Sequence, residues 1–490
     1  MLEVELKLDV TPDAASLIAS SAVLPADPQH KDLRATYFDT PAGDLAAAGF
    51  SLRIRTAGEE RVQTIKADGA TNAGLFMRSE WEMPAAGDTP VLDHTTPLKA
   101  LLGERAADLG AVFEVHVERT IWNVAEGEAQ IEAVLDRGQV LAHGRGELIC
   151  EFELELKSGP PAALFTLARK LDDIAPVRIG VLSKSERGYG LVAPPGKSVK
   201  GAPVTLKPEM DAATAFQHIA HACLRQFRQN EALLMEHRRA KALHQARVAL
   251  RRLRSAFSLF KPLFGEDAKA AALREELRWL AGSLGEARNL DVLIDRAPAG
   301  ALKARLEHAR AEAYDRVEAA LASPRARALM LDLMEWLADG AWLADADTAP
   351  SKSEPVREYA MRTLHRARRR VKKGGRNLAK VDDDARHELR KDAKKLRYAS
   401  EFFAALFDAK RGRRRHKRFI AALTDLQDQL GLLNDLATAP EEIAKLDLAD
   451  DAEAQALLGS ESKPHLIDAA AKAYDRLVDT KRFWRKGHVV

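Results

Sequence analysis

The sequence predicts a multidomain protein of mixed α and β class, in which a β-rich domain precedes an all-α domain. Residues 1–195 contain short segments where apolar and charged residues alternate, as in strands with one buried face. Residues 196–206 are rich in Pro and Gly and lack periodicity, which is typical of a linker. Residues 207–490 are dominated by Ala, Leu, Arg, Lys and Glu, which favour a helical bundle. A chain of 490 residues also exceeds one ordinary core.

The net charge of +3 conceals a division between the two parts of the chain. Residues 1–195 carry a net charge of −11, and the remainder carries +14. An acidic domain can hold a divalent cation, and a basic domain can attract a polyanion. Cys150 and Cys223 lie far apart and suggest neither a disulfide framework nor a metal site. Without a signal peptide or an apolar run of about 20 residues, the expected location is the cytoplasm, with no membrane contact.

The first eight residues alternate along their whole length. Leu2, Val4, Leu6 and Leu8 fall on one face of a strand, whereas Glu3, Glu5 and Lys7 fall on the other. The apolar face requires a core. In an isolated strand, the charged face would simply be solvated.

Later segments repeat this pattern with complementary charges. Strands are expected at 33–40, 50–55, 61–66, 78–82, 115–124, 129–136 and 148–157, followed by a helix at 160–174. Segment 50–55 places Arg53 and Arg55 opposite apolar neighbours. Segment 148–157 places Glu151, Glu153, Glu155 and Lys157 on one face. Each face alone could be solvated, but their occurrence together indicates that they converge.

The Glu3-x-Glu5-x-Lys7 strand and the strands that follow it resemble the CYTH superfamily, the triphosphate tunnel enzymes. This resemblance covers about 190 residues. It implies a closed antiparallel β-barrel whose lumen is lined by acidic and basic side chains. It also implies an enzyme acting on a triphosphate, with Mg²⁺ as the cofactor and Mn²⁺ as the alternative ion.

The resemblance also implies roles for individual residues, carried over one position at a time. The metal ligands would be Glu3, Glu5, Asp136, Glu153 and Glu155. The triphosphate would be bound by Arg53, Arg55, Lys66, Arg119 and Lys184. The catalytic residues would be Lys7, which orients the reacting end, together with Glu5 and Lys66. Glu80, Glu82 and Glu132 are expected to line the tunnel, and the role of Glu151 stays open.

The helical part contains a duplication, in which residues 244–254 are echoed by residues 387–397. Each copy begins with a histidine and carries basic residues at the same offsets, beside an apolar stripe. The first copy contains His244, Arg247, Arg251, Arg252 and Arg254, and the second contains His387, Arg390, Lys394, Lys395 and Arg397. We therefore expect two pseudo-repeats, at about 207–344 and 355–490, with their basic stripes facing a common channel.

This His-x-x-Arg repeat resembles the CHAD family, whose domains are associated with inorganic polyphosphate. A positive channel would suit a linear polyanion. The basic runs 366–373 and 411–418 keep nucleic acid as a less favoured partner, because no series of aromatic residues for base stacking accompanies them. His218 and His221 could share a metal, although hydrogen bonding to phosphate is the favoured role of the histidines.

The order CYTH then CHAD resembles bacterial inorganic triphosphatases. The resulting hypothesis is a Mg²⁺-dependent hydrolase that converts inorganic triphosphate to diphosphate and phosphate, with a helical domain that binds polyphosphate. An adenylate cyclase or a thiamine triphosphatase is the alternative enzyme, because all three kinds of enzyme would bind the triphosphate group of their substrates in the same way. A non-catalytic protein that binds polyphosphate or nucleic acid is the alternative from another class.

Overall fold

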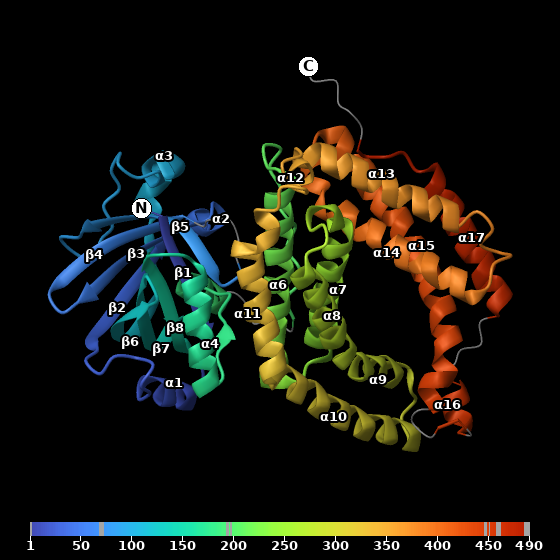
Figure 1. Cartoon of the computed structure of the whole chain (residues 1–490), viewed down its shortest axis with the longest axis horizontal. Coiled ribbons are helices and arrows are strands. Elements are labelled where there is room, and N and C mark those ends of the chain that lie inside the picture. Colours follow the sequence, from blue (N-terminus) through green and yellow to red (C-terminus); the bar gives the residue numbers. More distant parts are fainter. Residues whose placement is uncertain are drawn as a thin grey trace. The chain divides into compact units, whose positions relative to one another are not determined.

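The structure is a computed structural model that describes residues 2–67, 73–192, 196, 198–444, 448–449, 451–456 and 462–484 (Figure 1). The chain forms two compact units, called here the sheet unit and the helical unit. The sheet unit comprises Met1–Val199, Arg228–Leu233 and Leu321–Gly340, and the helical unit comprises Lys200–Phe227, Leu234–Ala320 and Ala341–Val490.

The sheet unit is built on antiparallel strands that close on themselves. The strands are β1 (Leu2–Asp9), β2 (Gln29–Asp39), β3 (Phe50–Ala57), β4 (Glu60–Ala67), β5 (Leu75–Pro84), β6 (Gly110–Glu126), β7 (Ala129–Ala142), β8 (Arg145–Ser158) and β9 (Arg178–Ile179). Their order is β5-β4-β3-β2-β6-β7-β8-β1-β9, and β5 pairs in addition with β1. Strands β1 to β8 therefore form a ring, with β9 attached to β1, and the prediction of a closed antiparallel barrel is confirmed.

The apolar faces of the strands turn outward, where short helices cover them. On β1 and β8, Leu6, Leu8 and Leu154 are fully buried, and helix α4 (Ala162–Ile174) packs over these strands. On β3 and β4, the outward apolar residues share a core with helices α2 (Asp44–Ala47) and α3 (Leu98–Leu102). Because side chains alternate along a strand, the charged residues between these positions must point into the lumen.

One end of the lumen is filled by apolar side chains. A core cluster there combines Leu33, Ala35 and Tyr37 of β2 with residues of β6, β7 and β8, and Tyr189 of helix α5 (Lys184–Val192) packs against it. The Tyr37 ring stacks on Phe113, with ring centroids 4.5 Å apart. The charged residues of the lumen therefore lie in the remaining part of the barrel, where they surround a cavity.

The helical unit is all α, as the sequence predicts. Its helices, together with α11, which belongs largely to the sheet unit, are α6 (Ala212–His237), α7 (Ala240–Leu259), α8 (Ala268–Ser283), α9 (Gly285–Arg296), α10 (Ala301–Ala322), α11 (Pro324–Asp339), α12 (Ala349–Lys352), α13 (Val356–Gly374), α14 (Asp383–Phe402), α15 (Lys410–Ala444), α16 (Ala452–Ala456) and α17 (Lys463–Asp479). The two echoed segments lie in α7 and α14, which pack against each other. In the described residues, no helix is both long and apolar enough to cross a membrane.

Helix α11 packs on α4 and β9 of the sheet unit. Arg327 lies 2.5 Å from the carboxylate of Asp172, and both side chains are largely buried. Arg169 of α4 contacts Asp332 and Glu335 of α11, at 2.8 and 2.5 Å. These ion pairs join a segment beyond residue 320 to the strand-rich part of the chain.

Candidate active site inside the closed sheet

The barrel encloses a cavity of about 690 Å³ whose described lining is mostly charged. The lining residues include Glu5, Lys7, Arg53, Arg55, Lys66, Arg119, Glu153, Glu155 and Lys184, together with Glu80, Glu82 and Glu132. Asp136 is fully buried directly behind this surface. The side chain of Glu3 lies outside the described part of the structure. Apart from Glu3, Asp136 and Glu151, each tunnel residue that the sequence singles out therefore borders the same space.

The cavity has a basic wall and an acidic wall. In a ring of eight strands, β3 lies four places from β8, so the two strands face each other across the lumen. Arg53 and Arg55 project from β3, and Glu153 and Glu155 project from β8. An elongated anion with a bound cation would match both walls at once.

On the acidic wall, carboxylates occupy directly opposed positions on three neighbouring strands. Glu155 of β8 is the register partner of Glu5 on β1 and of Glu132 on β7. Like charges that lie directly opposite each other destabilise a sheet unless a cation compensates them. Lys157 compensates part of this row, at 2.8 Å from Glu155 and 3.2 Å from Glu132. The row is therefore suited to a divalent cation, whose preferred ligands are carboxylate oxygens.

Lys184 is positioned by the start of a helix. The Ser183 side chain accepts a hydrogen bond from the Glu186 backbone N–H, at 3.2 Å, and the Glu186 carboxylate accepts one from the Ser183 N–H, at 2.8 Å. This reciprocal arrangement is a capping box, and it fixes Lys184 as the first residue of α5. The capping sequence thus decides where the ammonium group enters the barrel.

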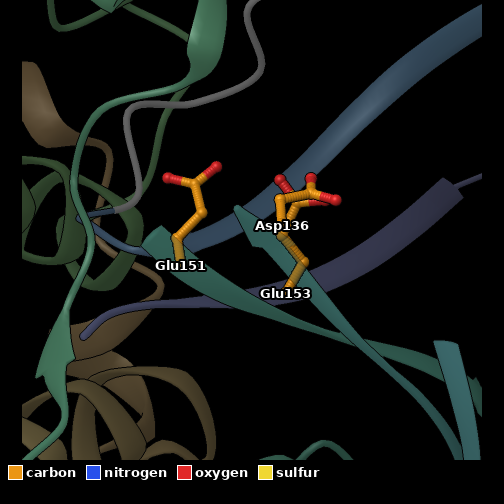
Figure 2. Close-up of side chains that lie close together, drawn as sticks. All are labelled: Asp136, Glu151 and Glu153. Atoms are coloured by element: carbon orange, nitrogen blue, oxygen red, sulfur yellow. The ribbon is translucent and has the colours of Figure 1, made fainter. Parts of the chain in front are cut away.

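A buried network of charges lies beside the cavity. Lys184 Nζ lies 2.6 Å from Asp136 and Glu151 and 2.7 Å from Glu153. Lys7 Nζ lies 2.9 Å from Glu151 and 2.5 Å from Glu153. Ligand atoms of the three carboxylates lie within 4.8 Å of one another, and Figure 2 shows those of Asp136 and Glu153 together, with Glu151 to one side. Two ammonium groups therefore compensate much of the charge of these three carboxylates.

The pKa values follow from this pairing. Burial alone would lower the pKa of Lys184, but Asp136, Glu151 and Glu153 outweigh it and raise that pKa well above its usual value. Burial would raise the pKa of Glu151, but Lys184 and Lys7 lower it to about 2. Both groups are thus charged at neutral pH, and the network is an ionic one rather than a proton store.

Two arginines complete the network. Arg119 donates two hydrogen bonds to Asp136, at 2.8 and 2.6 Å, and a third to Glu153, at 3.1 Å. Arg187 of α5 contacts Asp9, at 2.8 Å, and lies 3.7 Å from Glu151. The sequence patterns assign no role to Arg187, although its spacing of three residues from Lys184 on a helix is a usable signal. They leave the role of Glu151 open, and the structure places this residue at the centre of the network.

The basic wall carries positive charge in excess. Arg53 donates to the Tyr37 hydroxyl, at 3.3 Å. Burial, and then the neighbouring Arg53 and Arg119, lower the pKa of Arg55 below its usual value, although Glu82 lies 3.5 Å away. A guanidinium that is buried near two others favours the arrival of an anion, which would relieve their repulsion.

The helical unit contains a second cavity, of about 1080 Å³, between α7, α14 and α15. Six of the ten basic residues predicted for the channel line it: His244, Arg251, Arg252, Arg390, Lys394 and Arg397. Arg251 of the first repeat donates to the Tyr398 hydroxyl of the second, at 2.6 Å. The two copies of the echoed segment therefore meet at this cavity.

The other four predicted channel residues do not line this cavity. Arg247 donates to the Ala281 carbonyl, at 2.9 Å, and the His387 ring lies 2.8 Å from the Asn434 side chain. Arg254 and Lys395 are also absent from the lining. The basic residues of each helix cover a wider arc than the part of the helix that faces the cavity. Residues at the edges of that arc therefore contact other segments. The lining also includes residues 200–204, which the sequence predicts to lie in the linker.

Comparison with known proteins supports the prediction of two domains, a CYTH domain followed by a CHAD domain. The model of the CYTH domain matches residues 1–189, and that of the CHAD domain matches residues 218–444. An uncharacterized protein of Mycobacterium tuberculosis is 30% identical over 446 residues, which span 81% of this chain and 82% of that protein. This chain is a CYTH–CHAD protein.

Other relatives match one domain of the CYTH–CHAD protein. The inorganic triphosphatase of Haemophilus influenzae is 31% identical over 192 residues, which make up 38% of this chain. That match covers 54% of the relative, so it spans about half of its length. Among solved structures, the CHAD domain from the plant Ricinus communis has 26% identity and a TM-score of 0.48, and covers 57% of this chain and 96% of that one.

Proposed function

We propose that the CYTH–CHAD protein hydrolyses inorganic triphosphate to diphosphate and phosphate in the barrel, with Mg²⁺ as the cofactor. The observation that carries the proposal is the pair of opposed walls, with Arg53 and Arg55 facing Glu153 and Glu155 across one cavity. The inorganic triphosphatase of Haemophilus influenzae, which matches over the CYTH domain, supports the same reaction class.

The residues present fit a divalent cation. Glu5, Glu153 and Glu155 reach the cavity, and a cation held there would offset the repulsion between the directly opposed carboxylates of Glu5 and Glu155. Asp136 is fully buried and does not line the cavity, which favours a supporting role behind the ligands. If bound there, Mg²⁺ would neutralise the charge that develops on the phosphate oxygens.

The chain's own side chains then bind and orient the substrate. Arg53, Arg55 and Lys66 would hold phosphate oxygens from the basic wall. Lys7 and Lys184 extend ammonium groups from the buried network to the cavity surface, where they would orient the reacting phosphate. The fixed positions of these charges lower the cost of reorganisation during phosphoryl transfer.

The lining favours a substrate without an organic group. Tyr37 is the single aromatic residue among the described residues that line the cavity, and it is only 4% exposed. Its ring stacks on Phe113, and its hydroxyl is engaged by Arg53. The described residues thus offer no aromatic face to the adenine of ATP or the rings of thiamine triphosphate, which disfavours a cyclase or a thiamine triphosphatase.

Phosphate release tests the proposal. The purified protein is incubated with Mg²⁺ and, separately, tripolyphosphate, ATP, thiamine triphosphate or long-chain polyphosphate. Tripolyphosphate should be hydrolysed fastest, and EDTA should abolish its hydrolysis. Glu5→Gln should reduce the rate by roughly 100-fold, because it removes one charge from the proposed metal site. Equal rates for wild type and Glu5→Gln would eliminate the metal role of Glu5.

We propose a second function for the helical unit, the binding of inorganic polyphosphate. Its cavity collects cationic side chains from both repeats, among them Arg251, Arg390 and Lys394. The Nε atom of Arg390 is buried without a hydrogen-bond partner in the described structure. Such a group favours an added acceptor, and the many phosphates of a linear polyanion supply acceptors and charge together.

Competition between polyanions tests this second function. The full-length protein, kept in EDTA, should bind polyphosphate more tightly than single-stranded DNA at equal ionic strength. Arg390→Gln should weaken polyphosphate binding and reduce its dependence on salt, because one phosphate contact is lost. Tighter binding to DNA at equal salt would instead support the nucleic-acid alternative.

A further inference from the structure

A lysine without a partner lies in the wall of the helical unit's cavity. Lys394 projects from α14 into the space of about 1080 Å³ that α7, α14 and α15 enclose. Within the described residues, its amine forms no hydrogen bond and no ion pair. The lysines of the barrel provide the contrast, since Lys184 contacts three carboxylates.

The charges that face Lys394 come from three helices. Helix α7 contributes Arg247 and Arg251, α14 contributes Arg390, and α15 contributes Asp435. The described lining of the cavity carries Lys200, Arg251, Arg252, Arg390, Lys394 and Arg397 against Glu401, Asp428 and Asp435. Cationic side chains therefore outnumber carboxylates, which favours an incoming anion.

This environment disfavours the charged form of the amine. Burial, and then Arg390 and Arg251, lower the pKa of Lys394 from 10.5 to about 7. The neighbouring Arg247 shows the same effect: burial, and then Arg251 and Arg288, lower its pKa to about 10. At neutral pH the empty cavity therefore holds Lys394 partly as the neutral amine.

We propose that an anion entering this cavity is bound together with a proton, which Lys394 takes up from solvent as its amine becomes an ammonium ion. The proposal rests on the polyphosphate-binding function and adds a dependence on pH. A bound polyanion offsets the charges of Arg251 and Arg390, which line the cavity, and so removes repulsion that keeps the amine neutral. The Lys394 ammonium then supplies a positive charge and hydrogen-bond donors to the bound anion.

The sign of the pH dependence follows from linkage. The bound state carries the proton over a wider pH range than the free state, so affinity is full below pH 7 and is lost as pH rises above it. His244 and His416 also line the cavity, but burial lowers their pKa values below 6.5. The variant Lys394→Arg, described below, separates proton uptake by Lys394 from uptake by either histidine.

Calorimetry on the full-length protein in EDTA tests the proposal. Long-chain polyphosphate and dextran sulfate, whose sulfates do not titrate near neutrality, are the two probes. At pH 7.5, titrations in buffers of different ionisation enthalpy should give proton uptake by wild type with either probe. Its affinity should fall about tenfold between pH 7 and 8.5, the change expected from one group with a pKa near 7.

Two variants separate this mechanism from a general effect of pH. Lys394→Arg keeps a positive charge that does not titrate in this range, so it should bind without proton uptake and with an affinity that pH hardly changes. Lys391→Gln is the matched control, because Lys391 lies on the same helix, is exposed and pairs with Glu388. It should behave as wild type, and thermal unfolding should confirm that both variants are folded.

The outcomes distinguish the two proposals. Proton uptake by Lys394→Arg equal to that of wild type would overturn the role of Lys394, as would an unchanged wild-type affinity between pH 7 and 8.5. Absence of polyphosphate binding by wild type at every pH would instead overturn the binding function itself.

Discussion

Lys184 Nζ lies 2.7 Å from Glu153 Oε1, and this contact joins the first residue of a helix to the middle of a strand. The same ammonium group contacts Asp136 and Glu151. It therefore holds together three carboxylates that would otherwise repel one another beside the cavity.

Replacing Lys184 should affect stability and activity together. Lys184→Met keeps the length of the side chain but leaves the three carboxylates with less compensation, so we expect a loss of about 3–5 kcal/mol in the free energy of unfolding. Hydrolysis of triphosphate should fall by roughly 100-fold, since a fixed positive charge is lost from the cavity. Chemical denaturation and phosphate release provide the two measurements.

Lys170→Ala is the matched control for Lys184→Met. Lys170 forms an exposed ion pair with Glu126, and such pairs contribute about 0–1 kcal/mol. If Lys184→Met were no more destabilising than this control, the network would not contribute to stability as argued.

A glycine beside Lys7 provides a second prediction. The Gly180 N–H donates to the Lys7 carbonyl, at 2.8 Å, and a Cβ atom on Gly180 would lie 2.7 Å from Cγ of Lys7. Gly180→Ala must therefore displace the Lys7 side chain, and we expect a fall in kcat of about tenfold with a smaller change in KM. Steady-state kinetics on tripolyphosphate measures both constants.

Gly190→Ala is the matched control for this substitution, because no atom would lie within 4 Å of the new Cβ. It should retain full activity. An equal loss of activity in both variants would show that the segment tolerates alanine poorly for reasons unrelated to Lys7.

The ion pair between α11 and α4 leads to a third prediction. Arg327→Ala leaves Asp172 without the guanidinium that lies 2.5 Å away, in a place where both side chains are largely buried. We expect the free energy of unfolding to fall by about 3 kcal/mol. Arg316→Ala removes an exposed pair with Glu286 and should change it by less than about 1 kcal/mol. Thermal unfolding of the two variants compares the buried pair with the exposed one.

His221 should make the protein sensitive to acid. The residue is buried, and burial followed by the nearby His218 lowers its pKa from 6.5 to about 3. Below pH 6.5 the unfolded chain binds a proton that the folded chain excludes, so the free energy of unfolding declines as pH falls from 6.5 towards 3. At pH 5 this loss amounts to about 2 kcal/mol.

Denaturation curves between pH 7 and pH 5 measure this effect. His221→Gln should lose less stability over that interval than wild type, because glutamine does not titrate. Parallel curves for the two proteins would contradict the assignment. A neutral histidine in the core would also explain the pair His218 and His221 without a shared metal.

The closed sheet was predictable because charge and apolarity alternate without interruption in the relevant strands. Leu6 and Leu154 face outward, and Glu5 and Glu155 face the cavity, as the alternation requires. The position of Glu151 was not predictable in the same way. Alternation places it on the same face as Glu153, but only the closing of β8 against β1 and α5 decides that one is fully buried and the other reaches the cavity.

The helical unit was less predictable for a related reason. The repeat shows which helix faces carry His244 and Arg390, but not which other helices pack beside them. Arg247 and His387 are directed to Ala281 and Asn434 by neighbours far away in the sequence. Pairings of this kind depend on tertiary packing, which the periodicity of one helix does not encode.

The ring of strands has a consequence for how the protein is made. Glu5 of β1 pairs with Glu155 of β8, a partner 150 residues further along the chain. During synthesis, one edge of β1 can pair with β5, but its other edge stays unpaired until β8 has left the ribosome. Such a long sequence separation slows folding and leaves strand edges exposed to other nascent chains, so assistance by chaperones should matter most at this stage.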